Sequence, residues 1–257
     1  MSRYFLLRGN IDLAERLATG EPGALDELGE SPDLEITIDE ERAENMSTGG
    51  AFNEKDLSVT TYVGCKGTLK VKEVEGVNLP LALFGQETSE AGATVTAQAF
   101  PSGIADGDKV FLPGRPIGVT ALSIVDSNGT PATLALGSDY EADLDFGTVK
   151  FLDVSGFTQP FKATFTKPAI KSVSIGAQVP TEKFLFFRGI DIADEERPVV
   201  VEMYRTKLSP SKRIPLKSAD GKEVTVFEFE LEFLADPTKP RDPVLGRYGR
   251  LRYLPSA

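Results

Sequence analysis

The sequence predicts a mainly β protein with one short helix, and two observations carry that prediction. Residues 34–39 and 224–233 alternate apolar and polar side chains, which is the period of a strand with one face on a core and one in water. Between them, residues 94–167 form a run of short β-rich segments separated by turn dipeptides. The length of 257 residues permits one large domain or two modest ones.

Composition removes most enzyme classes. The chain has no His, no Trp and one Cys, and its 28 basic and 39 acidic residues give a net charge of −11. Without His there is no Ser-His-Asp triad, no Cys-His dyad and no imidazole metal ligand. The one thiol, Cys65, forms no intrachain disulfide, which fits a reducing cytoplasm. A structural or binding protein, or a carboxylate or lysine enzyme, remains; we expect no enzyme, no cofactor and no metal site.

The apolar segments are short. Residues 1–8 hold four apolar residues between two arginines, too few for the apolar region of a signal peptide. No stretch approaches the roughly 18 consecutive apolar residues that a membrane span needs. We therefore expect a soluble chain without an export signal or membrane anchoring.

The N-terminal third is expected to consist of strands around a long loop. Ile11, Leu13 and Leu17 suggest a weak helix over residues 10–17. Gly64 and Gly67 predict a turn, which would place Cys65 in or beside it. Strands are expected at 34–40, 57–63 and 68–74, with a polar loop over 44–56.

One short helix is expected over residues 77–84. Asn78 is a typical capping residue, Pro80 fits the first turn, and Gly85 ends the helix. Leu79, Leu83 and Phe84 would then share one face.

The remaining strands follow from alternation and turn residues. Central strands are expected at 94–100, 109–112, 118–125, 133–136, 147–152 and 161–165, with Ser127-Asn128-Gly129 as the strongest hairpin signal. Late strands are expected at 184–192, 199–208, 213–216 and 223–233.

The last of these strands carries three glutamates in register, Glu228, Glu230 and Glu232, opposite a Phe-rich face. Side chains two residues apart on a strand lie about 7 Å apart. An acid/base pair needs two contrasting environments, and no calcium-loop spacing is present. We interpret the glutamates as an exposed acidic sheet face.

Charge is distributed unevenly along the chain. Residues 10–47 hold twelve acidic and two basic residues, whereas residues 239–257 sum to +4. Two solvated surfaces would explain this, and so would a basic, proline-containing C-terminal arm that docks on an acidic region of a neighbouring copy. The sequence contains no block of Lys and Arg, so it does not favour tight DNA binding.

Eight short motifs follow one another over nearly the whole chain. They are Gly9-Asn10, the strand at 34–40, Ser47–Gly50, Asn78–Gly85, Gly137–Tyr140 with Asp145–Phe151, Phe186–Asp191, Glu202–Arg205 and Leu208–Pro210. In this order they resemble the major tail tube proteins of long-tailed, siphovirus-type bacteriophages, although many tail tube proteins are shorter.

The resemblance implies a two-sheet β-sandwich or partial barrel with one flanking helix. Residues 1–85 and 168–257 would form this tube domain with N- and C-terminal arms. Residues 86–167 would be a β-rich insertion on the outer surface; alternatively they belong to one large sandwich. Hexameric rings would stack into a tube that conducts DNA without tight binding, with tape measure and tail-end proteins as further partners. The protein would be assembled in the host bacterial cytoplasm and reside in the virion tail.

The resemblance also implies roles for particular residues. We expect the following to line the lumen, where carboxylates repel phosphate: Glu35, Asp39, Glu202, Glu228, Glu230 and Glu232. The inter-ring loop would use Glu44, Phe52, Asn53 and Asp56. The intersubunit arms would use Arg3, Arg8, Arg241, Arg247, Tyr248, Arg250, Arg252 and Tyr253.

Two other functions fit the same residues. One is the tube protein of a contractile injection or secretion system, with a less acidic bore. The other is a monomeric β-sandwich binding module or adhesin, which would have no use for unstructured arms.

Overall fold

The computed structural model describes residues 6–47, 54–73, 76, 78–179, 181–211, 214, 224–239 and 244–254. Of the residues described, 54% lie in strands and 3% in helix. Within the described residues the expected mainly β class, with several antiparallel sheets and one short helix, is therefore confirmed. None of the described helices is long and apolar enough to cross a membrane.

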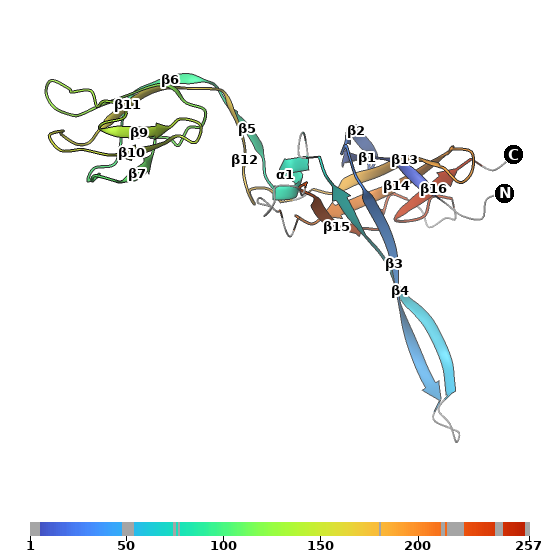
Figure 1. Ribbon diagram of the computed structural model, residues 1–257. Coiled ribbons are helices and arrows are strands. Elements are labelled where there is room, and N and C mark those ends of the chain that lie inside the picture. Colours follow the sequence, from blue (N-terminus) through green and yellow to red (C-terminus); the bar gives the residue numbers. More distant parts are fainter. Residues whose placement is uncertain are drawn as a thin grey trace. The chain divides into compact units, whose positions relative to one another are not determined.

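The chain divides into two compact units. Unit 1 comprises Met1–Gln86 and Val173–Ala257, and unit 2 comprises Glu87–Ser172 (Figure 1). The expected insertion covered residues 86–167. Unit 2 extends further along the chain because β12 (Ile170–Val173) pairs with β5 (Glu87–Glu90).

Unit 1 is built on an eight-stranded antiparallel sheet in the part of the chain described here. Its strands follow the order β2-β1-β13-β14-β15-β4-β3, and β16 pairs with β14. Their bounds are Leu7–Arg16 (β1), Pro22–Glu27 (β2), Asp33–Ser47 (β3), Glu54–Val71 (β4), Lys183–Asp191 (β13), Arg197–Leu208 (β14), Phe227–Phe233 (β15) and Gly249–Tyr253 (β16).

Both halves of this sheet contribute to one core. Leu13 and Leu185, from β1 and β13, belong to the same buried cluster as Leu69 of β4 and Phe229 of β15. The expected sandwich is therefore made from two halves of one hydrogen-bonded sheet, joined where β14 pairs with β13 and β15. Burial of these apolar side chains is the main term that stabilises the arrangement.

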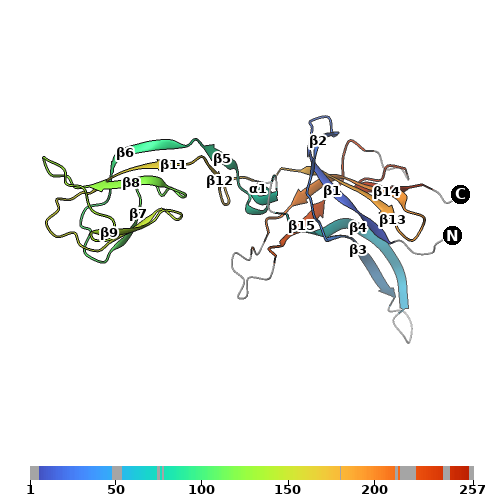
Figure 2. The same cartoon turned by 45° about the horizontal axis from the view of Figure 1, so that its top comes forward.

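Strands β3 and β4 continue beyond the rest of the sheet. They pair from Asp33–Lys70 to Ser47–Glu54, whereas β15 pairs with β4 only over Cys65–Val71. Residues 40–47 and 54–64 therefore form a two-stranded extension, which we name the ribbon (Figures 1 and 2).

The predicted turn at Gly64–Gly67 is wrong, because β4 runs straight through it. A Cβ atom on Gly67 would lie 2.3 Å from the Glu35 carbonyl oxygen and 3.0 Å from the Phe233 ring. The glycine allows a close approach inside a strand. Cys65 consequently lies in the core and not beside a turn.

The predicted helix over residues 10–17 is also wrong, since β1 occupies this segment. Four consecutive residues, Ile11–Ala14, are buried because both faces of the strand are covered. Ile11 and Leu13 belong to the main core, and Ala14 belongs to a second cluster with Phe184 and Tyr204. A strand buried on both faces loses the period of two that identifies half-buried strands.

The expected short helix is confirmed as α1, Asn78–Leu83. Asn78 acts differently from the predicted cap: its Nδ2 donates to the carbonyl oxygens of Leu28 and Glu73, at 3.0 and 3.1 Å. Its Oδ1 accepts no hydrogen bond from any described residue. Asn78 therefore anchors the start of the helix to neighbouring loops.

Unit 2 contains two three-stranded sheets, β7-β10-β9 and β6-β11-β8. Their strands are β6 (Ala93–Ala99), β7 (Lys109–Phe111), β8 (Thr120–Val125), β9 (Tyr140–Asp143), β10 (Thr148–Phe151) and β11 (Lys162–Lys167). Strand β9 was not expected from the sequence. A core of its own fills the unit, with Phe151 stacked on Phe161 at a centroid distance of 5.0 Å.

Candidate functional site

The outward face of β15 carries the three predicted glutamates. Along Phe227–Phe233 burial alternates without a break, so that Glu228, Glu230 and Glu232 are exposed and the aromatic and leucine side chains are buried. The predicted division of this strand into a core face and an acidic face is confirmed.

The register between strands places other charged residues beside these glutamates. Glu228 lies opposite Lys70, which lies opposite Asp33; Glu230, Thr68 and Glu35 form the next row. Glu232 lies opposite Lys66 of β4 and Lys207 of β14. We name the resulting surface the charged face: Asp33, Glu35, Asp39, Lys66, Lys70, Lys207, Glu228, Glu230 and Glu232.

The two lysines that β4 contributes to the charged face bind aspartates of β3. Lys70 Nζ lies 3.0 Å from Asp33 Oδ2, and Lys66 Nζ lies 3.1 Å from Asp39 Oδ2. These hydrogen bonds raise the pKa of each lysine, and nearby carboxylates add to the effect, Glu228 and Glu35 at Lys70 and Glu232 at Lys66. The face is acidic with screened lysines at its centre, and only the register between strands places these lysines beside the glutamates.

Glu202 differs from the residues of the charged face because its charge is paired. It is only 8% exposed and forms ion pairs with Arg250 and Arg252 of β16. The β-bulge in β14 between Met203 and Thr206 leaves Glu202 on the same side of the sheet as Lys207. Its lumen-lining role stays a prediction, and in the single chain its carboxylate is already paired with two arginines.

The predicted C-terminal arm folds onto its own sheet. Arg250 and Arg252 lie on β16, which pairs with β14, and the Tyr248 hydroxyl donates to the Val63 carbonyl at 2.5 Å. The Arg247 carbonyl accepts from Asp236 N, and Tyr253 is exposed. Residues 249–253 of the predicted arm are therefore a strand of the chain's own sheet, and their intersubunit role stays a prediction.

The N-terminal arm residues are only partly described. Arg8 lies on β1, opposite Ile190, and is exposed. Arg3 and Arg241 lie outside the described residues.

The predicted inter-ring loop is mostly strand. Glu44 lies opposite Ser58 and pairs with Lys55, and Asp56 accepts a hydrogen bond from Asn45 Nδ2 at 2.8 Å. Glu44 and Asp56 are therefore strand residues of the ribbon, and Phe52 and Asn53 lie outside the described residues.

One face of the ribbon carries three partly exposed apolar side chains of β4. Opposite pairs place Ala43 with Val59 and Asn45 with Leu57, and Tyr62, beyond a bulge, lies opposite Glu41 on the same face. Leu57, Val59 and Tyr62 are each about half exposed. The strand expected at 57–63 is present, but alternation along one strand does not show whether another element covers its apolar side chains.

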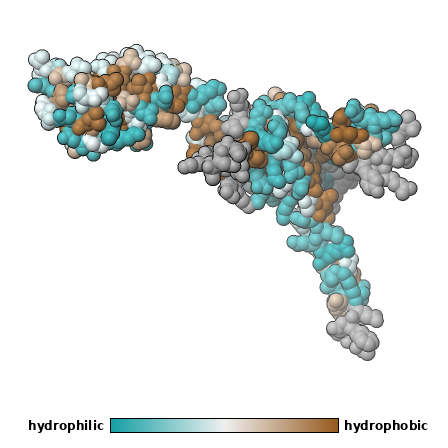
Figure 3. Space-filling model, in the orientation of Figure 1, coloured by the Kyte–Doolittle hydropathy of each residue, from teal (hydrophilic) through white to brown (hydrophobic). Residues whose placement is uncertain are grey.

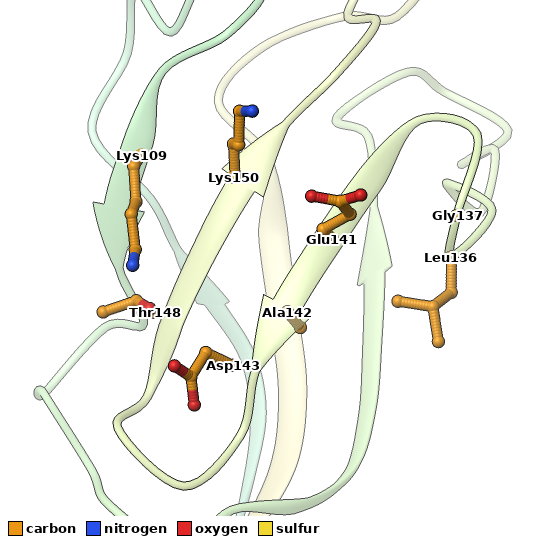
Figure 4. A pocket seen from close by; sticks show the side chains of 8 residues that line it. All are labelled: Lys109, Leu136, Gly137, Glu141, Ala142, Asp143, Thr148 and Lys150. Atoms are coloured by element: carbon orange, nitrogen blue, oxygen red, sulfur yellow. The ribbon is translucent and has the colours of Figure 1, made fainter.

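Unit 2 has an open groove on the outward side of β7-β10-β9. Its volume is about 490 Å³, and Figure 4 shows Lys109, Lys150, Glu141 and Asp143 along it, with Leu136 at one side. Both carboxylates are exposed, so they lack the contrasting environments of an acid/base pair. On the molecular surface polar and apolar residues intermix (Figure 3).

The structure offers little support for a metal or thiol centre. In the described ranges no three Cys, Asp or Glu side chains gather where a metal ion could be held. Burial, with a contribution from Asp39, raises the pKa of the Cys65 thiol, which disfavours the reactive thiolate.

The model of a protein family described as "Protein of unknown function UCP028589" matches residues 4–252. A search of curated proteins found no match.

Proposed function

We propose that this chain, which belongs to the family described as protein of unknown function UCP028589, is a bacteriophage tail tube protein. In this proposal six copies form a ring, rings stack, and the charged face lines a bore that conducts DNA. The proposal rests on the resemblance of the motifs given above and on the charged face.

The charged face is the observation that carries the proposal. Six carboxylates and three lysines on three adjacent strands and the end of a fourth give it a net charge of −3. Such a surface repels phosphate and avoids the salt-dependent adhesion that basic residues cause. A regular sheet face suits a wall that many base pairs pass, because its carboxylates repeat in rows across neighbouring strands.

The ribbon supports the stacking of rings. A two-stranded hairpin is marginally stable alone, and half-exposed Leu57, Val59 and Tyr62 on one face gain stability when a second surface covers them. In the proposal that surface belongs to a copy in the next ring.

Assembly can be tested with the purified chain at high concentration, by negative-stain microscopy and analytical ultracentrifugation. Rings or tubes are expected. The double variant Leu57→Ser with Val59→Ser should shift the population from tubes toward single rings or monomers, because it removes apolar area from the ribbon.

The matched control changes the opposite face of the same strand, with Ser58→Ala and Thr60→Ala, and should assemble like the wild type. A wild-type chain that stays monomeric at every concentration would contradict the proposal. It would favour the second candidate, a monomeric binding module, for which the groove in unit 2 is the supporting observation.

A further inference from the structure

Lys66 and Lys70 lie at the centre of the charged face, where a bore for DNA should carry no cations. Their side chains are 64% and 40% exposed, so a phosphate could reach them. We infer that Asp33 and Asp39 are screening residues, which keep these two lysines from binding nucleic-acid phosphate. This inference rests on the proposed function and names the residues that determine it.

Each lysine has carboxylates on both neighbouring strands. Lys70 binds Asp33 of β3 and lies opposite Glu228 of β15. Lys66 binds Asp39 of β3 and lies opposite Glu232 of β15. A phosphate that approaches either ammonium group therefore meets negative charge from two sides.

Distances on a sheet make this screening effective. Neighbouring strands are about 4.8 Å apart and successive residues on one face about 7 Å apart. Both spacings are shorter than the Debye length of about 8 Å at physiological salt. Each lysine is therefore within one Debye length of several carboxylates, and their negative charge opposes the approach of a phosphate.

Stability alone does not account for the aspartates. Exposed ion pairs contribute little to folding, commonly below about 1 kcal/mol. The lysines have a clearer structural use, since they reduce repulsion among six carboxylates on adjacent strands. The aspartates then prevent those lysines from becoming a phosphate site.

The experiment measures DNA binding by the soluble chain. Fluorescence anisotropy of a labelled duplex of about 25 base pairs is followed at 25–200 mM salt for the wild type and for Asp33→Asn with Asp39→Asn. Wild type should not bind. The double variant should bind, and the logarithm of its binding constant should fall with the logarithm of the salt concentration with a slope of about −2. Two lysines become able to contact phosphate, and each contact contributes about −0.9 to the slope.

Two controls isolate the cause. Asp26→Asn with Asp145→Asn makes the same change in net charge on exposed residues elsewhere and should not bind. Adding Lys66→Gln and Lys70→Gln to the Asp33/Asp39 variant should abolish the gained binding. If the Asp33/Asp39 variant binds no better than its control, or if binding survives loss of both lysines, the inference is wrong.

A second variant covers the case in which the first fails to fold. Glu228→Gln with Glu232→Gln removes the carboxylates on the other side of the same lysines and should give the same gain. None of these measurements requires a tube. Absence of tubes would therefore reject the proposed function alone, and absence of the gain would reject the screening role alone.

Discussion

Asp236 shows how a single buried charge joins separate segments of unit 1. This carboxylate is fully buried and accepts from Arg16 Nη2 at 3.0 Å, Thr238 N at 2.9 Å and Thr238 Oγ1 at 2.8 Å, while Asp236 N donates to the Arg247 carbonyl. Burial disfavours the charged form. The hydrogen bonds from Thr238 and Arg16 outweigh it and hold the pKa of Asp236 below its ordinary value.

Asp236→Asn should lower the free energy of unfolding by about 2–4 kcal/mol at pH 7, because Arg16 loses its partner in a buried site. The pKa of Asp236 is lower in the folded protein than in the unfolded chain, where it is about 3.9. The charged carboxylate therefore stabilises the fold above about pH 3.9, and this stabilisation is lost as the pH falls through the folded-state pKa. Urea unfolding at pH 7, 5 and 3 should therefore show the difference from wild type shrinking at the lowest pH. Glu21→Gln, at an exposed pair with Lys239, should change stability little. A difference independent of pH would contradict this account.

At the scale of elements, β16 depends on one carboxylate. Glu202 of β14 lies opposite Arg250 in the register and binds both Arg250 and Arg252, while Leu251 and Tyr253 remain about half exposed. Charge pairing and backbone hydrogen bonds, more than apolar burial, therefore hold the C-terminal strand on the sheet.

Glu202→Gln should increase local opening of β16, because two arginines lose their counter-charge. We expect amide hydrogen exchange over residues 249–253 to accelerate by about tenfold or more, which corresponds to a loss of about 1.4 kcal/mol. Lys207→Gln, on the exposed end of the same strand, is the control and should leave exchange in β16 unchanged. Unchanged exchange in Glu202→Gln would show that the ion pairs do not hold the strand.

The elements also show what a sequence can predict. Strand β15 was predictable because one face is buried and one exposed, and α1 because Pro80 and Gly85 mark its ends. Strand β1 was not, because both of its faces are covered, and the middle of β4 was not, because Gly67 allows close packing in place of a turn.

The candidate site likewise contains residues that the sequence could place and residues that it could not. The glutamates of β15 could be placed on one face from local alternation, whereas the lysines beside them follow only from the register between strands. Glu202 and Arg250 are 48 residues apart, and no local pattern pairs them. Long-range pairing is the information that one sequence lacks.

On the scale of the whole molecule, the two units have separate cores. Phe161 is fully buried in unit 2, stacked on Phe151 and in edge contact with Phe157 at a centroid distance of 6.5 Å. Unit 2 is continuous in sequence, while unit 1 is made from the two flanking segments. We expect each unit to unfold as its own cooperative transition.

Phe161→Ala should lower the stability of unit 2 by about 3–5 kcal/mol, through lost burial and the cavity left behind. The transition of unit 1 should keep its midpoint. Urea unfolding followed by two-dimensional NMR, with separate signals from each unit, measures both. A single transition that shifts as a whole would show that the units fold together.

The position of Cys65 makes these two transitions separable by chemistry as well. It is the one thiol in the chain, and it lies buried in β4, in the core of unit 1. A thiol reagent can modify it only after that core opens. The rate of thiol labelling therefore reports the opening of unit 1. Unit 2 has no cysteine, so its opening and closing leave the labelling of Cys65 unchanged.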